Sequence, residues 1–387
     1  MNKKILIAII FIFLGISAHG QKHGKITANI KGLENDTVCI YHYPLTDASL
    51  ITKDTIVAQD NRFTFKTPKE PTAFAIIPNQ AIFKRRSGGF YIAQSKFIEL
   101  FTRADEQINI VGDMEKYYIN YNINGNDIST DLAQLRKTYK TPAIEAVKLE
   151  LGMDSLRQVG ESDEVINKLF ESRNQYFDQI SQSKSQYVDQ NLDKDLSAYL
   201  ISRFSLESFT NYYPKLTKNI REGLFEKMLK QQYQRYQNYL ATNIAEKQIT
   251  AGTEAPNFSL LDNNGQTVSL SDFKGKLIVL DFWGTWCGPC LQQLPILKSF
   301  HNDYGSDVAL ISIACNDKEI EWKKTIARPG FNWTQLINNE EHDVSALYGV
   351  KAFPTKIIID KDLKIIKRFI GAKKDFFIEM EELLKKK

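Results

Sequence analysis

The stretch Trp286-Cys287-Gly288-Pro289-Cys290 contains two cysteines separated by two residues. At the start of a helix, positions i and i+3 lie on the same face, so the two sulfur atoms are close enough to close into a disulfide and reopen. A C-x-x-C pair alone also occurs in zinc sites. The residues around the pair must therefore decide between a redox-active dithiol and a metal site.

The flanking residues place the pair at a junction between a strand and a helix. Residues 277–282 form a short apolar run without proline or glycine, which is typical of a buried parallel strand. Residues 291–300 have the apolar spacing of a helix. Cys287 is therefore expected at the helix N-terminus, where unpaired N–H groups and the helix dipole favour a thiolate. Because only a thiolate attacks a disulfide, Cys287 is the predicted nucleophile.

These residues resemble the active-site region of the thioredoxin superfamily, and the resemblance covers residues 251–387. It rests on the stretch from Trp286 to Cys290, on Asp281-Phe282-Trp283, on Pro295 and on Phe353-Pro354-Thr355. It implies a thioredoxin-like α/β fold for the C-terminal part of the chain. The C-terminal part is similar to the TlpA/ResA-like branch, because a leading hairpin and an extra element before Pro354 accompany an export signal.

The resemblance also implies a role for each matched residue. Cys287 attacks a substrate disulfide, and Cys290 resolves the mixed disulfide that results. Asp281, buried in apolar surroundings beneath the dithiol, accepts the proton of Cys290. The expected contacts with substrate come from Trp286, Gly288, Pro289, Phe353 and Pro354, the last as a cis-proline. The Gly-Pro pair between the cysteines implies a reductase of protein disulfides that needs no cofactor.

The first twenty residues have the pattern of a signal peptide. The pattern consists of Lys3, Lys4, an apolar run at residues 5–16, Ala18 and Gly20. Cleavage would start the mature chain near Gln21 and place it in the periplasm. The alternative is an uncleaved membrane anchor, although the apolar run is short for a bilayer span. A reductase outside the cytoplasm must be re-reduced there, which implies a membrane electron donor.

The chain has 387 residues, enough for two to three domains. Residues 21–122 alternate in the manner of short strands and predict a small antiparallel sandwich or barrel. This part resembles a β-domain that precedes thioredoxin modules in exported proteins of some Gram-negative bacteria. Residues 123–249 have helical patterns and predict a spacer or bundle, and residues 250–387 form the predicted catalytic domain.

The charge balance of the chain bears on the kind of partner it can bind. Fifty basic and 46 acidic residues give a net charge of +4, which provides no reason to expect nucleic acid as a partner.

Besides the dithiol, the chain has Cys39 and Cys315. Cys39 is expected to be a buried, inert thiol, and Cys315 to lie at a strand end near the active site. A bridge between these two cysteines stays open.

Three other functions compete with that of a reductase. A peroxiredoxin-like peroxidase is disfavoured because Thr285 lacks the required spacing from the cysteine and a second cysteine follows. A non-enzymatic scaffold that carries a thioredoxin module is disfavoured by the intact dithiol. A zinc site is disfavoured because His301 and His342 are isolated, so no metal is expected. The substrate stays open between apocytochrome c, as in cytochrome c maturation, a misoxidised exported protein and one dedicated partner.

Three local patterns give further predictions. Asn264-Gly265, between two apolar runs, predicts a hairpin with a type I′ turn. The basic run at residues 84–86, next to two glycines, predicts a solvated hairpin tip. Aromatic residues at helical spacing indicate either a core or domain contact, which is favoured, or a groove for a partner: Phe225, Tyr233, Tyr236 and Tyr239.

Overall fold

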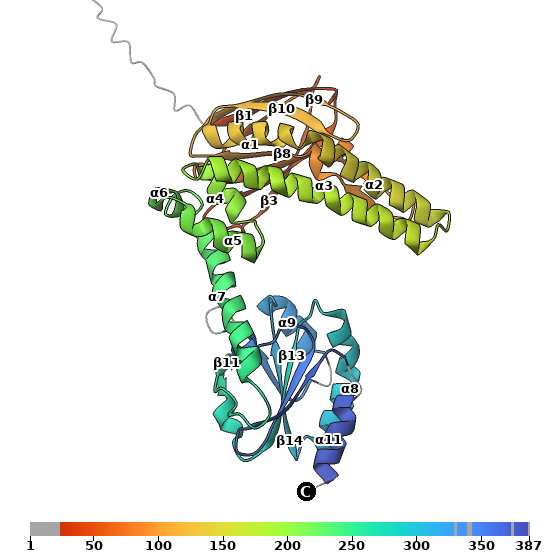
Figure 1. Ribbon diagram of the computed structural model, residues 1–387, viewed down its shortest axis with the longest axis vertical. Helices are drawn as coiled ribbons and strands as arrows, with labels where there is room; N and C mark the ends of the chain where they lie inside the picture. The colour runs from red at the N-terminus through yellow and green to blue at the C-terminus, as the bar shows by residue number, and fades with distance from the viewer. Residues whose placement is uncertain (1–23, 329–330, 339–342, 373–374, 386–387) are drawn as a thin grey trace, which may run out of the picture. The chain divides into compact units, whose positions relative to one another are not determined.

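The computed structural model describes residues 24–328, 331–338, 343–372 and 375–385 (Figure 1). The chain divides into two compact units, one ending at Gln232 and the other beginning at Tyr233. The predicted signal peptide lies outside the described residues. No helix in the described part of the chain combines the length and the apolar content needed to cross a bilayer. The finer division at residues 122 and 249 stays a prediction.

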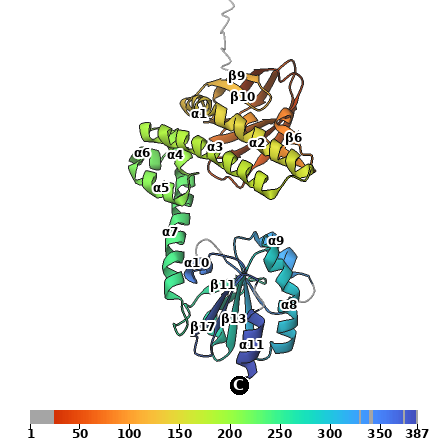
Figure 2. The same cartoon turned by 45° about the vertical axis from the view of Figure 1, so that its right-hand side comes forward.

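The first unit contains a β-sandwich, as the alternating sequence predicts (Figure 2). One four-stranded sheet has the order β10 (Ile119–Asn124), β9 (Gln107–Met114), β1 (Lys25–Lys31) and β4 (Arg62–Lys66). The other has the order β3 (Thr52–Val57), β2 (Thr37–Pro44), β5 (Thr72–Pro78) and β8 (Ile98–Thr102). Alternate residues of β1 are buried, which packs Ile26, Ala28 and Ile30 between the sheets. The pairing is antiparallel except between β1 and β9, which run parallel.

The basic run at residues 84–86 lies at a hairpin tip, between β6 (Ile82–Lys84) and β7 (Phe90–Ile92). Lys84 and Arg86 are exposed, as predicted. Arg85 is not simply solvated, because its guanidinium pairs with Glu150 at 2.8 Å. Asp154 accepts a hydrogen bond from the backbone N–H of Arg86 at 2.6 Å. The tip is therefore held against the helical part of the same unit.

Helices form the rest of the first unit, as their apolar spacing predicts. They are α1 (Asp127–Thr138), α2 (Lys140–Gln158), α3 (Asp163–Gln190), α4 (Asp195–Ile201), α5 (Leu206–Tyr212) and α6 (Lys218–Arg221). Side-chain caps from Asn126, Ser162 and Ser205 begin three of them. Phe225 is buried against Phe101, with ring centroids 5.2 Å apart. Tyr233 and Tyr239 are exposed. Of the aromatic residues predicted to be core residues, Phe225 is therefore one, whereas Tyr233 and Tyr239 are not.

The second unit is a mixed α/β sheet. Its described strands have the order β12 (Thr267–Ser269), β11 (Ser259–Asp262), β15 (Thr334–Ile337), β14 (Val308–Ala314), β13 (Leu277–Trp283), β16 (Thr355–Ile359) and β17 (Ile365–Ile370). Its helices are α8 (Gly288–Tyr304), α9 (Glu319–Ile326), α10 (Val344–Leu347) and α11 (Asp375–Lys385), together with the later part of α7 (Glu226–Gln248). Between β14 and Pro354 the described residues form α9, β15 and α10, where an extra element is predicted.

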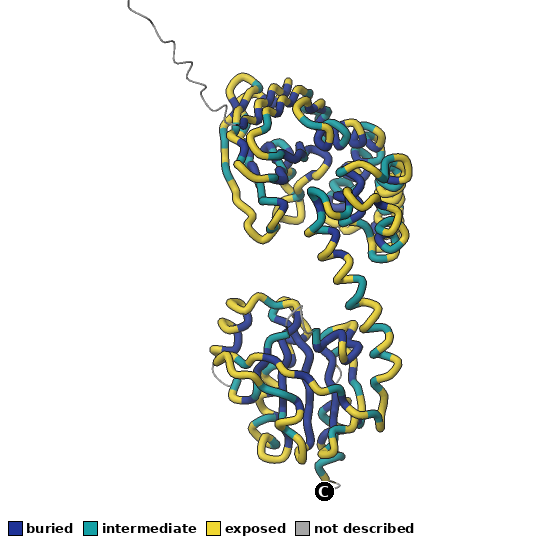
Figure 3. The backbone as a smooth tube through the Cα atoms, turned by 90° about the vertical axis from the view of Figure 1, so that its left-hand side faces the viewer, coloured by how far each residue is buried: buried dark blue, intermediate teal, exposed yellow. Residues whose placement is uncertain are grey.

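The side chains of β13 alternate between the two faces of this sheet, and each face packs against a different cluster of residues. All seven residues of β13 are buried, and its strand lies within the dark core of the second unit in Figure 3. Leu277 and Val279 pack with residues of α8 and α11, whereas Leu280 and Phe282 pack into the cluster on the opposite face. Because side chains alternate, Asp281 belongs to the face covered by α8.

The hairpin between β11 and β12 forms as predicted, but its turn differs. Gly265 has a φ of +80°, whereas Asn264 is not among the residues with positive φ. A type I′ turn needs positive φ at both central positions, so that prediction is wrong. The Asp262 carboxylate accepts hydrogen bonds from the N–H groups of Asn264 and Gln266, both at 2.8 Å. This capping favours a three-residue loop in which only the glycine is left-handed.

Candidate active site

The two cysteines of the dithiol lie at the point where β13 leads into α8. They form a disulfide, with Cα atoms 5.2 Å apart. Cys287 is the N-cap of α8, and its sulfur accepts a hydrogen bond from the N–H of Cys290 at 3.2 Å. The helix then continues to Tyr304. The N-terminus of α8 thus directs unpaired N–H groups and the positive end of its dipole at the Cys287 sulfur.

Access to the dithiol is limited by burial. Cys287 is 5% exposed and Cys290 is 2% exposed, so both sulfurs are largely covered in the oxidised state. Gly288 and Pro289, between them, are exposed. Pro289 lies in the first turn of α8, where a backbone N–H has no helical partner and its loss costs nothing. Gly288 and Pro289 thus form part of the exposed surface next to the buried sulfurs.

The loop before the dithiol is fixed by a carboxylate that the sequence did not reveal. Asp317 accepts a hydrogen bond from the backbone N–H of Thr285 at 2.9 Å, and the Thr285 hydroxyl also donates to it. The backbone N–H of Cys287 donates to the carbonyl of Gly284 at 3.1 Å. These bonds hold the three residues before α8 in one conformation.

Trp286 and Phe353, both predicted to contact substrate, lie together beside the dithiol. Trp286 is 54% exposed, and its indole N–H donates to the carbonyl of Cys315 at 2.9 Å. Its ring meets the Phe353 ring edge to face, with centroids 5.4 Å apart. The peptide bond from Phe353 to Pro354 is cis, in the loop that leads into β16. The structure therefore gathers residues from two distant segments on one surface.

Gly284 is a further residue of this loop that the sequence did not single out. A Cβ atom at this position would lie 2.5 Å from Nε1 and 2.8 Å from Cε2 of Trp286. Any larger residue would therefore displace the indole ring. In the sequence, the available signal was a glycine between a buried strand and a tryptophan. The need for glycine becomes clear only in the structure, where the Trp286 ring folds back against this position.

Asp281 lies in the buried layer between the sheet and α8, but its surroundings are not purely apolar as predicted. Its side chain is 1% exposed. The Ser312 hydroxyl donates to Oδ2 at 3.1 Å, and the Lys356 ammonium nitrogen lies 3.1 Å from Oδ1. Ser312 comes from β14 and Lys356 from β16, the two neighbours of β13. The prediction missed both partners, because they come from other strands of the sheet.

The other two cysteines are free thiols in the structure, so the possible bridge between them is not formed. Cys39 is half-buried rather than buried, which departs from the prediction. Cys315 is buried directly after β14, and its backbone carbonyl binds the indole of Trp286. Burial raises the pKa of the Cys315 thiol well above its ordinary value, which disfavours the thiolate. Within the described ranges, no three His, Cys, Asp or Glu side chains are arranged to hold a metal ion.

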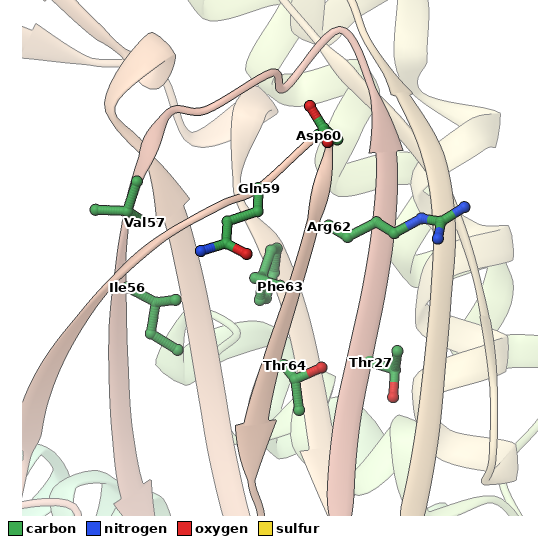
Figure 4. A pocket seen from close by; sticks show the side chains of 8 residues that line it. All are labelled: Thr27, Ile56, Val57, Gln59, Asp60, Arg62, Phe63 and Thr64. Atoms are coloured by element: carbon green, nitrogen blue, oxygen red, sulfur yellow. The ribbon is translucent and has the colours of Figure 1, made fainter.

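An open crevice of about 720 Å³ lies in the first unit, beside the edge strands β3 and β4 (Figure 4). Its lining consists of Thr27, Ile56, Val57, Gln59, Asp60, Arg62, Phe63 and Thr64. None of these was a predicted site residue, and the dithiol belongs to the other unit.

Known proteins resemble this chain in the region of the dithiol. A family model described as Redoxin matches residues 250–384. The thiol-disulfide oxidoreductase ResA of Bacillus cereus is 34% identical over 152 residues, which are 39% of this chain and 84% of the relative. ResA of Bacillus subtilis is 31% identical over 137 residues, which are 35% of this chain and 76% of the relative.

Two solved structures also match part of this chain. A putative thiol:disulfide interchange protein DsbE from Chlorobium tepidum is 28% identical, with a TM-score of 0.33, and the match covers 35% of this chain and 96% of that one. The thioredoxin domain of a thiol-disulfide oxidoreductase from Bacteroides vulgatus is also 28% identical, with a TM-score of 0.32 and coverages of 35% and 97%.

Proposed function

Through its C-terminal domain the chain belongs to the ResA-like, redoxin family of thiol-disulfide oxidoreductases, and we propose that it reduces disulfide bonds of exported proteins. The observation that carries the proposal is the position of Cys287 as the N-cap of α8, with its sulfur bonded to a backbone N–H. Such a position stabilises a thiolate once the disulfide is reduced. The disulfide between Cys287 and Cys290 is then the product of a catalytic cycle.

The first step is attack of the Cys287 thiolate on a substrate disulfide. The substrate S–S bond breaks, a bond forms between Cys287 and one substrate sulfur, and the other substrate sulfur leaves as a thiolate. In the second step Cys290 loses its proton and attacks Cys287. The protein disulfide closes, the second substrate thiolate leaves, and two electrons have passed from the dithiol to the substrate.

Asp281 is the proposed acceptor of the Cys290 proton. It lies on the face of β13 covered by α8, the helix that carries Cys290, and its side chain is almost fully buried. Water is scarce in such a layer, so a nearby carboxylate provides the local base that the second step requires. The substrate chain is proposed to lie over Gly288 and Pro289 and against Trp286, Phe353 and Pro354.

The cycle leaves the protein oxidised, so a reductase outside the cytoplasm needs an electron donor in the membrane. The signal-like first twenty residues support export to the periplasm. Cysteine pairs of apocytochrome c, misoxidised exported proteins and a single dedicated partner remain the candidate substrates. Each presents the same chemistry, a disulfide accessible to a nucleophile at a helix N-terminus.

Trapping of mixed disulfides tests the proposal. A Cys290→Ser variant expressed in the native compartment cannot complete the second step, so substrates should stay attached to Cys287 and be identified after purification. The control is Cys287→Ser, which should capture none of them. If the control captures the same proteins, Cys287 is not the nucleophile. If Cys290→Ser captures nothing and instead consumes peroxide, the peroxidase alternative is correct.

A further inference from the structure

A cluster of buried polar side chains surrounds Asp281. Its other members have no role in the reaction proposed above. The side chains come from β13, β14, β16, α8 and the segment before β15. All are at most 7% exposed: Asp281, Ser312, Lys356, Gln293 and Trp333. Burying this many polar groups is costly unless each is paired, so their arrangement constrains the protonation of every member.

The hydrogen bond from Trp333 sets the direction of the bond to Asp281. The indole N–H of Trp333 lies 2.9 Å from the Ser312 oxygen, and an indole N–H only donates. The hydroxyl oxygen of Ser312 is therefore an acceptor in that bond. Its own hydrogen is free to point at Oδ2 of Asp281, 3.1 Å away. In this arrangement Oδ2 is the acceptor of the Ser312 hydroxyl hydrogen.

Lys356 supplies the second constraint, from the other side of the carboxylate. Its ammonium nitrogen donates to Oε1 of Gln293 at 2.7 Å and lies 3.1 Å from Oδ1 of Asp281. Oδ1 accepts no hydrogen bond from the described residues, so its interaction with the ammonium group is an ion pair. A neutral Asp281 would leave a positive charge in the interior beside a group that no longer balances it. The cluster therefore fits the ionised carboxylate.

We propose that Lys356 is a positioning residue for the second step of the proposed disulfide reduction, because its ammonium group keeps Asp281 ionised and ready to take the proton of Cys290. Gln293, which holds the ammonium group, lies three residues after Cys290 on α8 and thus on the same face of the helix. The proton leaves the Cys290 sulfur and binds an Asp281 oxygen. Lys356 keeps its charge while the negative charge passes from Asp281 to the Cys290 sulfur. When Cys290 attacks Cys287, that charge leaves with the substrate thiolate, and Asp281 returns to the carboxylate by giving its proton to the departing thiolate or to solvent.

Other titratable groups lie around this cluster and have to be considered in any pH dependence. Cys315 follows β14 and interacts electrostatically with Asp281, Asp317 and Asp343. His301 of α8 faces Trp333, with ring centroids 5.6 Å apart, and burial lowers its pKa. The helix α11 presents the apolar ring of Phe376, 5.6 Å from the Lys356 nitrogen. Among these groups, Lys356 is the cation in contact with the carboxylate.

The test separates the two steps of the reaction in one experiment. The reduced full-length protein is mixed with one equivalent of dithiobis(nitrobenzoate), which releases one coloured thiol on attack by Cys287 and a second when Cys290 closes the disulfide. Release of two thiols reports that the dithiol works, which is the proposed function. The rate of the second release between about pH 6 and pH 9 reports the step that depends on Asp281 and Lys356.

Four proteins are compared: wild type, Lys356→Met, Asp281→Asn and the double variant. Loss of an opposite charge at this distance should move the acid limb of the second-step profile of Lys356→Met to higher pH by about one unit or more. At about pH 7 the second release should then be at least about tenfold slower, with recovery at alkaline pH. In the Asp281→Asn background, Lys356→Met should cause no further shift.

Two results would overturn the role of Lys356 without touching the function of the dithiol. One is a second-step profile of Lys356→Met that superimposes on the wild type. The other is an equal slowing by Lys356→Met in the wild-type and Asp281→Asn backgrounds, which would indicate a structural effect. The double variant replaces both charges, so it leaves no buried unpaired ion and keeps the comparison interpretable. Failure to release two thiols in the wild type would instead contradict the proposed function.

Discussion

Gly288, between the two cysteines, has no structural need to be glycine. A Cβ atom there would meet no heavy atom within 4 Å, and the residue is exposed at the start of α8. Its φ does not lie in the left-handed region either. The space beside Gly288 is therefore open. This supports a close approach of the substrate backbone to Cys287 over a residue without a side chain.

Gly288→Ala should therefore separate substrate binding from folding. We expect the unfolding free energy to be unchanged or to rise by at most about 1 kcal/mol, since alanine favours helices. Reduction of a protein disulfide should slow about tenfold, equal to about 1.4 kcal/mol in the barrier. Reduction of dithiobis(nitrobenzoate), which has no backbone to accommodate, should be unaffected. Both rates are measured by absorbance in the same buffer.

Gly152 provides the matched control for this substitution. It also lies in a helix, α2, with open space around the position of its Cβ atom. Gly152→Ala should leave both reductions unchanged. If Gly288→Ala reduces the protein substrate as fast as the control does, substrate backbone does not pass over this residue.

The predictable residues of the site are those whose chemistry follows from short spacing. Cys287 and Cys290 are three positions apart, and Phe353-Pro354 is a dipeptide, so each could be identified locally. Lys356 could not, because a lysine at a strand end is usually solvated and its partner Gln293 is 63 residues away. The role of Lys356 becomes visible only in the folded sheet, where β16 pairs with β13 and brings Lys356 beside Asp281.

At the level of elements, helix α1 is held to the sandwich by a buried guanidinium. Arg136 is 5% exposed, donates to the carbonyl of Ser95 at 3.1 Å and pairs with Glu99 at 3.1 Å. The same guanidinium lies over the rings of Tyr118 and Tyr121, 5.9 and 5.3 Å from their centroids. One side chain of α1 therefore satisfies partners from η2 (Gln94–Lys96), β8 and β10.

Arg136→Ala should weaken this attachment strongly. We expect a loss of about 3 kcal/mol in unfolding free energy, because the partners of a buried cation are left unpaired. Its neighbour Lys137 is half-buried and donates to the side-chain amides of Asn122 and Gln134, so Lys137→Ala should cost less than about 0.5 kcal/mol. Urea denaturation of the full chain, followed by far-UV circular dichroism, measures both. Equal losses for the two variants would mean that the guanidinium does not anchor the helix.

Regular elements were more predictable than the connections and pairings between them. The alternation within residues 21–122 and the helical spacing within residues 123–249 are local signals, and strands and helices formed there as the patterns indicated. The turn at Gly265 was assigned incorrectly because Asp262, outside the Asn-Gly pair, caps the loop. The parallel pairing of β1 with β9 joins segments far apart in the chain, and no local pattern encodes it.

At the scale of the whole molecule, the boundary between the compact units falls inside α7. The second unit begins at Tyr233, although the family model begins at residue 250. Gly349 has a φ of +62°, and a Cβ atom there would lie 2.4 Å from the backbone nitrogen of Glu246. The Glu246 carboxylate also pairs with Lys351 at 2.5 Å. Residues 233–248 are thus packed onto the redox unit as part of it.

A pair of fragments tests whether the redox unit needs this segment. Residues 233–387 and 250–387 both contain every residue of the dithiol site. We expect the longer fragment to unfold with a free energy about 2 kcal/mol higher, from the packing and hydrogen bonds that α7 adds. Gly349→Ala in the longer fragment should remove most of that difference, since the added Cβ atom would push the helix away. Equal stability of the two fragments in urea would place the boundary at residue 250 instead.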